Sequence, residues 1–254
     1  MEIRKYKTAL VLSGGGVRGF AHLGVLKALN EKGIYPDVIS GTSAGAIAAT
    51  LYADGYTPDE IIGFFKEKEL LKYIEIIIPK TGLVKMTGMI KLITKYLRAR
   101  TFEELKIPVF IAACNLNLGK TEYFSTGDLI KPLIASASIP VLFSPVKINQ
   151  YYYVDGGVMD NFPIKTVEKK AEKIIGVFVC PINYQENFTS LKNIAIRSFH
   201  LAVNKNIVLK SPQCDIFIAP KEVDNYGLLD VKNNENLFKI GYTEAKKVLK
   251  NLTI

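Results

Sequence analysis

Short apolar runs alternate with amphipathic stretches along most of the chain. The apolar runs are bounded by glycine, proline or polar residues and predict buried strands at residues 8–13, 38–40, 108–114, 174–180 and 215–219. Shorter extended stretches are expected at residues 121–125, 145–148 and 151–154. Apolar residues recur at helical spacing in residues 20–32, 128–138, 189–210 and 234–252, and through a mixed basic and apolar region at 56–105. Strands alternating with helices predict an α/β fold, and we expect one domain over residues 1–254.

A glycine-rich loop separates the first predicted strand from the first helix, and it reads Gly14-Gly15-Gly16-Val17-Arg18-Gly19. Its spacing satisfies the G-x-G-x-x-G pattern of dinucleotide sites, in which an acidic residue farther along holds the ribose. Asp37 lies at about the right distance, but it opens the second strand, whereas the ribose-binding acid should close that strand. The alternative is an oxyanion hole, in which the amides of Gly15 and Gly16, with Arg18 nearby, stabilise developing negative charge.

The second predicted strand leads into Gly41-Thr42-Ser43-Ala44-Gly45, a G-x-S-x-G pattern before a helix of small residues. This pattern is typical of a nucleophile elbow, in which the serine sits on a strained strand-to-helix turn. Gly41 and Gly45 would let the helix pack against the strand where a Cβ would clash, and the amide of Ala44 would lie beside an oxyanion forming at Ser43. A tight βα turn without chemistry has the same composition. Because parallel strands end at one sheet edge, we expect this turn to lie near the glycine loop.

A nucleophilic serine needs a base, and the chain has two histidines. The sequence Asp155-Gly156-Gly157 follows a predicted strand and is either a hairpin-type turn or a placed carboxylate. The order Ser43, Asp155, His200 matches that of α/β-hydrolase triads. Against a triad, only one strand-helix unit precedes Ser43, and His200 lies inside a predicted helix. His22 is also inside a predicted helix, so we expect both histidines to be structural and to lie away from the nucleophile.

Together the three motifs resemble those of the patatin-like phospholipases, namely a glycine-rich loop at Gly14–Gly19, a nucleophile elbow at Gly41–Gly45 and an Asp-Gly-Gly motif at Asp155–Gly157. Residues 135–146 are similar to the segment that precedes the aspartate in that family. The resemblance covers about residues 8–165. Ser13 departs from the pattern, because many members have Asp before the glycines, but no chemistry is assigned to that side chain.

The resemblance implies a three-layer αβα fold around a mainly parallel central sheet, and a serine acyl hydrolase that cleaves ester bonds of lipids. It implies a Ser-Asp dyad, with Ser43 as nucleophile and Asp155 as base, that works through an acyl-enzyme without a cofactor or metal ion. The expected oxyanion hole comprises Gly14, Gly15, Gly16, Arg18 and Ala44, and the motif glycines are Gly19, Gly41, Gly45, Gly156 and Gly157. The alternatives are an acyltransferase or small-ester esterase of the same fold, or a non-catalytic binding or regulatory protein.

The composition and net charge of the chain narrow the kinds of molecule that it is expected to bind. A net charge of +9 favours anionic surfaces, but the chain has no zinc-finger, RRM-like or basic-helix pattern, so we expect no nucleic acid partner. Cys114, Cys180 and Cys214 lack metal-type spacing and predict reduced thiols in a cytosolic protein. The apolar run near residue 9 is too short for a signal peptide or membrane span. We therefore expect a cytoplasmic protein that acts on a lipid or acyl-ester substrate, with peripheral contact at the inner membrane surface as an option.

One predicted helix has separate apolar and basic faces, formed by Met86, Met89, Ile90 and Ile93 and by Lys91, Lys95 and Arg98, respectively. Such a helix could lie on an anionic membrane, with its basic residues among the headgroups. The alternative is that its apolar face packs on the protein core.

Overall fold

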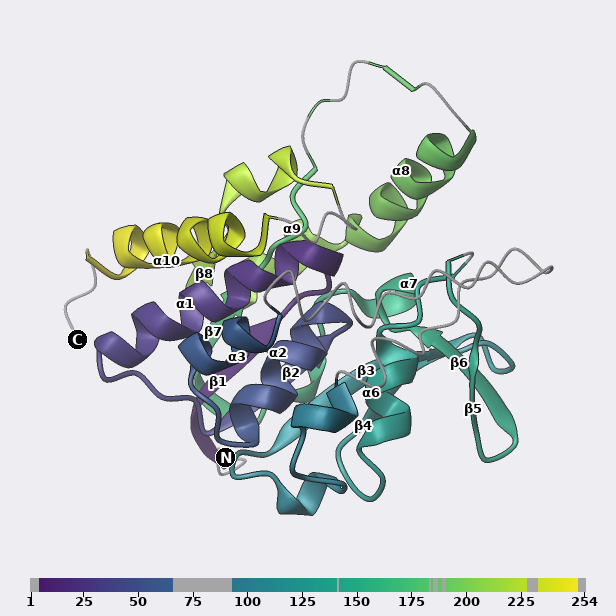
Figure 1. Ribbon diagram of the computed structural model, residues 1–254, viewed down its shortest axis with the longest axis horizontal. Helices are drawn as coiled ribbons and strands as arrows, with labels where there is room; N and C mark the ends of the chain where they lie inside the picture. The colour runs from purple at the N-terminus through teal and green to yellow at the C-terminus, as the bar shows by residue number, and fades with distance from the viewer. Residues whose placement is uncertain are drawn as a thin grey trace.

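The structure is a computed structural model and describes residues 5–65, 93–140, 142–182, 184, 187–188, 191–227 and 233–250. Within these residues an eight-stranded sheet has the order β5-β6-β3-β2-β1-β7-β8, with β4 also paired to β3 (Figure 1). The strands are β1 (Tyr6–Leu12), β2 (Val38–Thr42), β3 (Val109–Asn115), β4 (Lys120–Phe124), β5 (Val146–Ile148), β6 (Tyr151–Asp155), β7 (Ala171–Val177) and β8 (Ile216–Ile218).

The middle of the sheet is parallel and one side is antiparallel. Strand β1 runs parallel to β2 and β7, β2 runs parallel to β3, and β7 runs parallel to β8. Strands β4 and β6 pair with β3 in the antiparallel direction, and β5 and β6 form an antiparallel pair. Strands joined by a short turn pair antiparallel, whereas parallel neighbours need a longer crossover.

Helices lie on both faces of the sheet (Figure 1). The α-helices are α1 (Phe20–Glu31), α2 (Ala44–Ala53), α3 (Pro58–Phe64), α6 (Ile130–Ser136), α7 (Gly157–Asp160), α8 (Leu191–Asn204), α9 (Ile207–Lys210) and α10 (Asn234–Lys250). Short 3₁₀ helices are η1 (Gly16–Gly19), η2 (Phe102–Glu104), η3 (Ile164–Thr166), η4 (Ser211–Gln213) and η5 (Lys221–Asn225). The helix expected at 189–210 is thus divided into α8 and α9. At the end of α8 the side chain of Asn204 donates to the carbonyl of His200, a contact that competes with continued helix.

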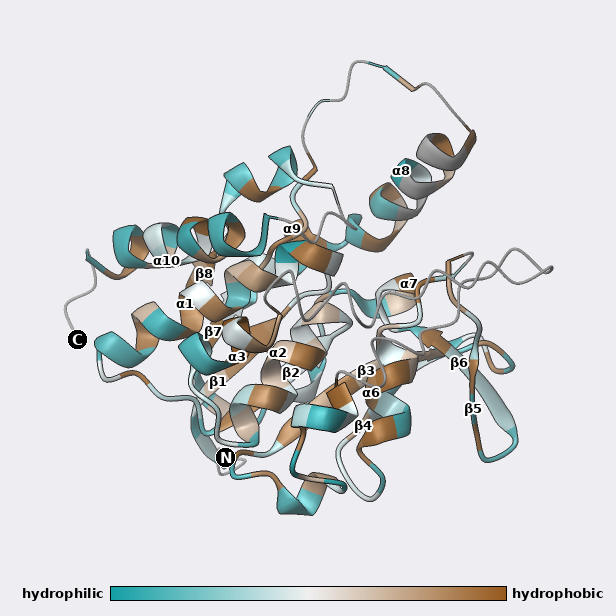
Figure 2. Cartoon of the chain, in the orientation of Figure 1, coloured by the Kyte–Doolittle hydropathy of each residue, from teal (hydrophilic) through white to brown (hydrophobic). Residues whose placement is uncertain are grey.

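The side chains of strand β1 show why both faces of the sheet are covered by other elements. Leu10 and Leu12 belong to a core with α1, α2 and α10, whereas Ala9 and Val11 belong to a second core that includes Phe162 of the segment after α7. Successive side chains of a strand point to opposite faces, so an apolar strand requires cover on both. Figure 2 shows apolar residues along the sheet and the inner faces of α1 and α2, and polar residues along the outside of α10. The predicted α/β fold, with a central sheet flanked by helices, is confirmed.

The predicted two-faced helix is described only at its C-terminal end. Most of its residues, including Met86, Met89, Ile90 and Lys91, lie outside the described residues. At the described end, Ile93 and Leu97 are buried in the core, and the guanidinium carbon of Arg98 lies 4.0 Å from the centre of the Tyr56 ring. This end therefore packs on the core.

Candidate active site

Strand β3 brings the two predicted catalytic residues together. Strand β2 ends at Thr42, which pairs with Ala112 of β3. Strand β6 ends at Asp155, which pairs with the next residue, Ala113. Because Ser43 directly follows Thr42, Ser43 and Asp155 reach neighbouring positions along β3, although they lie far apart in the sequence.

Ser43 occupies a strained backbone conformation between β2 and α2, with φ 54° and ψ −122°. Positive φ is uncommon for residues other than glycine and persists only where the surroundings impose it. The surroundings here are tight: a Cβ on Gly45 would lie 2.4 Å from the carbonyl oxygen of Leu12, and one on Gly41 would lie 2.7 Å from the amide nitrogen of Ala46. The helix therefore packs on the strands as closely as an elbow requires.

The hydroxyl of Ser43 is hydrogen-bonded to the carboxylate of Asp155. The backbone N–H of Gly157 also donates to Asp155 Oδ1, at 2.7 Å. Ser43 and Asp155 are only 6% and 3% exposed. Burial raises the pKa of Asp155 to about 6, although the two hydrogen bonds act in the opposite direction. Asp155 is therefore a stronger base than an exposed carboxylate and still ionises near neutral pH.

Ser43 and Asp155 line a hollow of about 310 Å³, part of which is open solvent. The other lining residues are Gly15, Gly16, Ile139, Gly157, Asn161, Cys180, His200 and Val203. The structure thus brings the glycine loop, the G-x-S-x-G turn and the Asp-Gly-Gly motif to one place, together with α8.

Two residues of the glycine loop, Gly15 and Gly16, line this hollow. Gly16 has φ 57°, in the left-handed region that favours glycine. Among the described residues, the N–H groups of Gly15 and Gly16 have no hydrogen-bond partner, whereas the N–H of Gly14 donates to the carbonyl of Asn161 at 3.1 Å. The amide of Gly14 is therefore committed within the protein, unlike the expectation for the oxyanion hole. Ala44 begins α2, where helix N–H groups lack helical acceptors.

Arg18 was expected near the oxyanion, but its side chain is engaged elsewhere. Its Nε donates to the carbonyl of Tyr226 at 2.9 Å, and its Nη1 lies 2.8 Å from Asp224 Oδ1 in a buried ion pair. Arg18 is also not among the residues that line the hollow. Its charge is compensated by η5, which follows the motif-bearing part of the chain, so the motif pattern alone could not show this contact.

The two histidines differ in their position relative to the hollow. His22 is fully buried in α1, and its Nε2 donates to the carbonyl of Ser13 at 2.8 Å, which agrees with a structural role. His200 lies inside α8 as expected, but it lines the same hollow as Ser43 and Asp155, so the prediction that it lies away from the nucleophile is wrong. The helical pattern around His200 does not indicate this position, because it depends on how α8 packs against α7.

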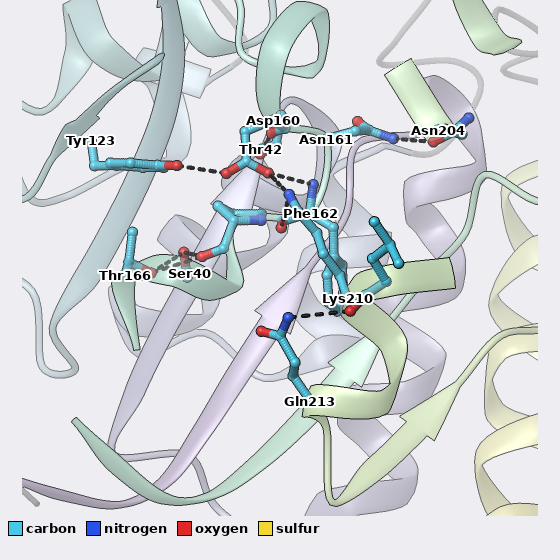
Figure 3. A network of polar contacts seen from close by, with 12 residues as sticks. Ser40, Thr42, Tyr123, Asp160, Asn161, Phe162, Thr166, Asn204, Lys210 and Gln213 are labelled. Atoms are coloured by element: carbon cyan, nitrogen blue, oxygen red, sulfur yellow. Dashed lines mark hydrogen bonds and ion pairs between the residues drawn. The ribbon is translucent and has the colours of Figure 1, made fainter. Parts of the chain in front are cut away.

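A polar network that the sequence motifs do not indicate surrounds the segment after Asp155 (Figure 3). Asp160, in α7, accepts the hydroxyl proton of Tyr123 at 2.6 Å and forms an ion pair with Lys210. The carbonyl of Asp160 accepts the hydroxyl of Thr42, the residue before Ser43, at 2.9 Å. The side-chain amide of Asn161 donates to Asn204 Oδ1 at 2.8 Å. The short helix after the Asp-Gly-Gly motif therefore connects the serine turn with α8 and α9.

Two further properties concern metals and membranes. In the part of the chain that the structure describes, no three His, Cys, Asp or Glu residues gather in a way that could hold a metal ion. No helix in that same part has both the length and the apolar character needed to cross a bilayer.

The fold and the site together define the class of this protein. It is an α/β protein in which a serine lies on a strained strand-to-helix turn and a buried carboxylate lies beside that serine. Residues 10–167 match the family model described as "Patatin-like phospholipase". The chain therefore belongs to the patatin-like phospholipase family, as its three motifs predicted.

Several known proteins share sequence with this chain, and one solved structure shares its fold. The chain is 28% identical to "Lysophospholipase NTE1" of Kluyveromyces lactis over 276 residues, which cover 96% of this chain and 19% of that protein. It is 30% identical over 164 residues to an uncharacterized NTE family protein of Mycobacterium tuberculosis, covering 63% and 45% of the two chains. The fold is similar to that of VipD from Legionella pneumophila, with a TM-score of 0.57, 17% identity, and 97% and 67% of the two chains covered. The chain spans about a fifth of the yeast relative's length.

Proposed function

We propose that this chain is a serine acyl hydrolase that cleaves carboxylic ester bonds of lipids, with Ser43 as nucleophile and Asp155 as base. The observation that carries the proposal is the hydrogen bond from the Ser43 hydroxyl to the buried Asp155 carboxylate, whose pKa is raised to about 6. Family membership and a relative named as a lysophospholipase support a lipid ester as substrate.

In the first half-reaction, Ser43 Oγ attacks the ester carbonyl carbon while its proton passes to Asp155. The resulting oxyanion is stabilised by the backbone amides of Gly15 and Gly16 and by the N-terminus of α2 at Ala44. When the intermediate collapses, the bond to the alcohol oxygen breaks and Asp155 returns the proton to that oxygen. The alcohol leaves, and the acyl group stays on Ser43.

In the second half-reaction, water replaces the alcohol. Asp155 accepts a proton from the water as its oxygen attacks the acyl carbon, and the proton then passes to Ser43 Oγ as the fatty acid is released. A carboxylate is a weak base for a hydroxyl, so the reaction depends on the fixed contact between Ser43 and Asp155 and on their burial. In a Ser-His-Asp triad an imidazole stands between serine and carboxylate, whereas here the two are in direct contact.

The experiment compares Ser43→Ala and Asp155→Asn with wild type on a p-nitrophenyl ester and a monoacyl phospholipid. We expect each variant to lose about a thousandfold or more of kcat/KM and to remain folded, and the double variant to lose little more than either single one. Ser138→Ala is the control, because Ser138 is also buried and its hydroxyl donates to the carbonyl of Ile134 in the preceding helix, α6. Wild-type turnover by Asp155→Asn would show that Asp155 is not the base.

We also propose that the chain contacts anionic lipid surfaces through α8 and α9, beside the hollow. Leu191, Leu201, Val208 and Leu209 are exposed there, the neighbouring Lys205 is exposed and basic, and the chain carries a net charge of +9. Exposed apolar residues flanked by basic ones suit an anionic bilayer. The three free cysteines support a reducing compartment such as the cytoplasm.

Vesicle co-sedimentation tests this contact. We expect Val208→Ser/Leu209→Ser to weaken binding to anionic vesicles about tenfold or more, because two apolar side chains no longer insert. Tyr35→Ser removes an exposed apolar side chain elsewhere and should bind like wild type. Unchanged binding of the double variant would exclude α9 as the contact.

A further inference from the structure

His200 has a buried nitrogen with no assigned partner. The residue is 7% exposed and lines the hollow with Ser43 and Asp155. Its Nε2 has no hydrogen-bond partner among the described residues. The Nδ1 of His22 also lacks one among these residues, but His22 does not line the hollow. Buried polar atoms without a partner are uncommon and unfavourable, and they call for an explanation.

The imidazole of His200 is neutral at working pH. Burial, followed by the positive charge of Arg18, lowers its pKa to about 4, while Asp224 acts in the opposite direction and Arg197 adds to the lowering. A neutral imidazole has one N–H donor and one nitrogen acceptor. Whichever tautomer is present, Nε2 can make one hydrogen bond, as donor or as acceptor.

Hydrogen bonds connect the backbone of His200 to the segment that follows the predicted base. Asn204 donates through its side-chain amide to the carbonyl of His200 at 3.0 Å and accepts from Asn161 at 2.8 Å. Asn161 lies in the same turn as Gly157, whose N–H donates to Asp155. Two hydrogen bonds thus connect the backbone of His200 to Asn161, at the end of the short helix that begins in the Asp-Gly-Gly motif.

We propose that His200 Nε2 binds a free hydroxyl on the alcohol portion of the ester, next to the bond that is cleaved. The inference rests on the proposed hydrolase function and deepens it, because His200 then selects esters that carry such a hydroxyl, as monoacyl glycerol lipids do, over esters that lack it. His200 is a specificity-determining residue in this assignment and is neither nucleophile nor base.

The hydroxyl of the alcohol portion is inferred by considering each part of an ester substrate in turn. The acyl chain has no polar atom to offer, and the carbonyl oxygen is bound by the glycine-loop amides in the proposed mechanism. Among the groups of an ester substrate, the alcohol portion is therefore the one that can supply a partner. A hydroxyl both donates and accepts, and it therefore satisfies either tautomer of His200, whereas an ester or ether oxygen only accepts. The hollow is small, so a bound alcohol portion lies in direct contact with its lining.

The test uses two water-soluble probes. One is a hexanoyl monoester of glycerophosphocholine, which has a free hydroxyl beside the ester, and the other is the corresponding ester of propanediol phosphocholine, which lacks it. We expect wild type to favour the hydroxyl probe about tenfold or more in kcat/KM, because a site built to bind a hydroxyl discriminates against the analogue without it. The measured quantity is this ratio, which a loss of general stability leaves unchanged.

Three variants complete the test. His200→Leu should reduce the preference to within about threefold, since its side chain cannot form a hydrogen bond. His200→Gln should retain part of the preference, because an amide has both donor and acceptor. Ser198→Ala, at an exposed position of the same helix, is the matched control and should keep the wild-type ratio.

The outcomes separate this inference from the proposed function. If wild type hydrolyses both probes equally, the inference is wrong, and that result needs no variant to fold. An unchanged ratio in His200→Leu, with both rates lowered alike, also contradicts it and points to a catalytic or structural role. If wild type cleaves neither probe and no p-nitrophenyl ester, and Ser43 resists fluorophosphonate, the proposed hydrolase function itself fails.

Discussion

The hydroxyl of Ser136 accepts the backbone N–H of Ser43 at 2.9 Å. The same hydroxyl donates to the carbonyl of Ala112 at 2.7 Å. Ser136 is fully buried at the end of α6, so it ties the strained turn to the strand that also pairs with the end of β6. This contact holds Ser43 in a conformation that its own backbone disfavours.

We expect Ser136→Ala to lower kcat for ester hydrolysis about tenfold to a hundredfold, because Ser43 is no longer held in the attacking geometry. The free energy of unfolding should fall by about 1–3 kcal/mol, since two buried backbone groups lose their partner. Steady-state kinetics and urea denaturation measure the two effects. Ser138→Ala is the matched control, because it should lose stability while kcat stays near wild type. Equal kcat values for the two variants would contradict the positioning role.

Asp155→Asn should be more stable than wild type at neutral pH while being inactive. The pKa of Asp155 in the folded protein, about 6, lies above the 3.8 of an unperturbed aspartate, so the folded protein loses stability as pH rises between these values. The asparagine variant avoids this loss, which amounts to about 3 kcal/mol above pH 7. We expect the gain in thermal unfolding temperature to be large at pH 8 and clearly smaller at pH 5. A variant less stable than wild type at pH 8 would contradict the buried charge.

The pH dependence of kcat/KM should follow the ionisation of Asp155. The base must be ionised to accept the proton of Ser43, so activity should rise with pH, with an apparent pKa near 6, and then level off. The measurement uses a soluble p-nitrophenyl ester at constant ionic strength. The pKa of His200 is lowered to about 4, so the inflection should stay near 6 in His200→Gln. Its disappearance in that variant would identify a histidine as the base.

The ion pair of Arg18 and Asp224 should affect stability more than catalysis. Arg18→Met removes the guanidinium that is paired with the largely buried Asp224 carboxylate, which should cost about 3–5 kcal/mol of unfolding free energy. The double variant Arg18→Met/Asp224→Leu should recover most of that loss, because neither charge remains. Chemical denaturation measures the stabilities, and turnover per fluorophosphonate-labelled molecule measures catalysis. A hundredfold drop in that turnover for Arg18→Met would return Arg18 to the oxyanion hole.

Much of the fold could be predicted from the sequence, because the relevant physics is local. Apolar runs such as residues 8–13 and 174–180 form strands near the expected positions, since buried parallel strands need continuous apolar residues. Ser43 occurs between glycines because only residues without a Cβ permit the close approach of α2. The division between α8 and α9 was missed, because it involves Asn204, whose side chain bonds to the helix carbonyl of His200 and to a distant residue.

The sequence by itself determined the turn that strains Ser43, the glycine loop and the order of strands and helices, because each depends on neighbours within a few residues. Only the tertiary structure decided which groups meet there. Pairing on adjacent residues of β3 sets Asp155 beside Ser43, and packing of α8 against α7 brings in His200, while Ser136 reaches the Ser43 amide from α6. These contacts join residues far apart in the chain. Their geometry follows from sheet register and helix packing, which no local pattern of residues encodes.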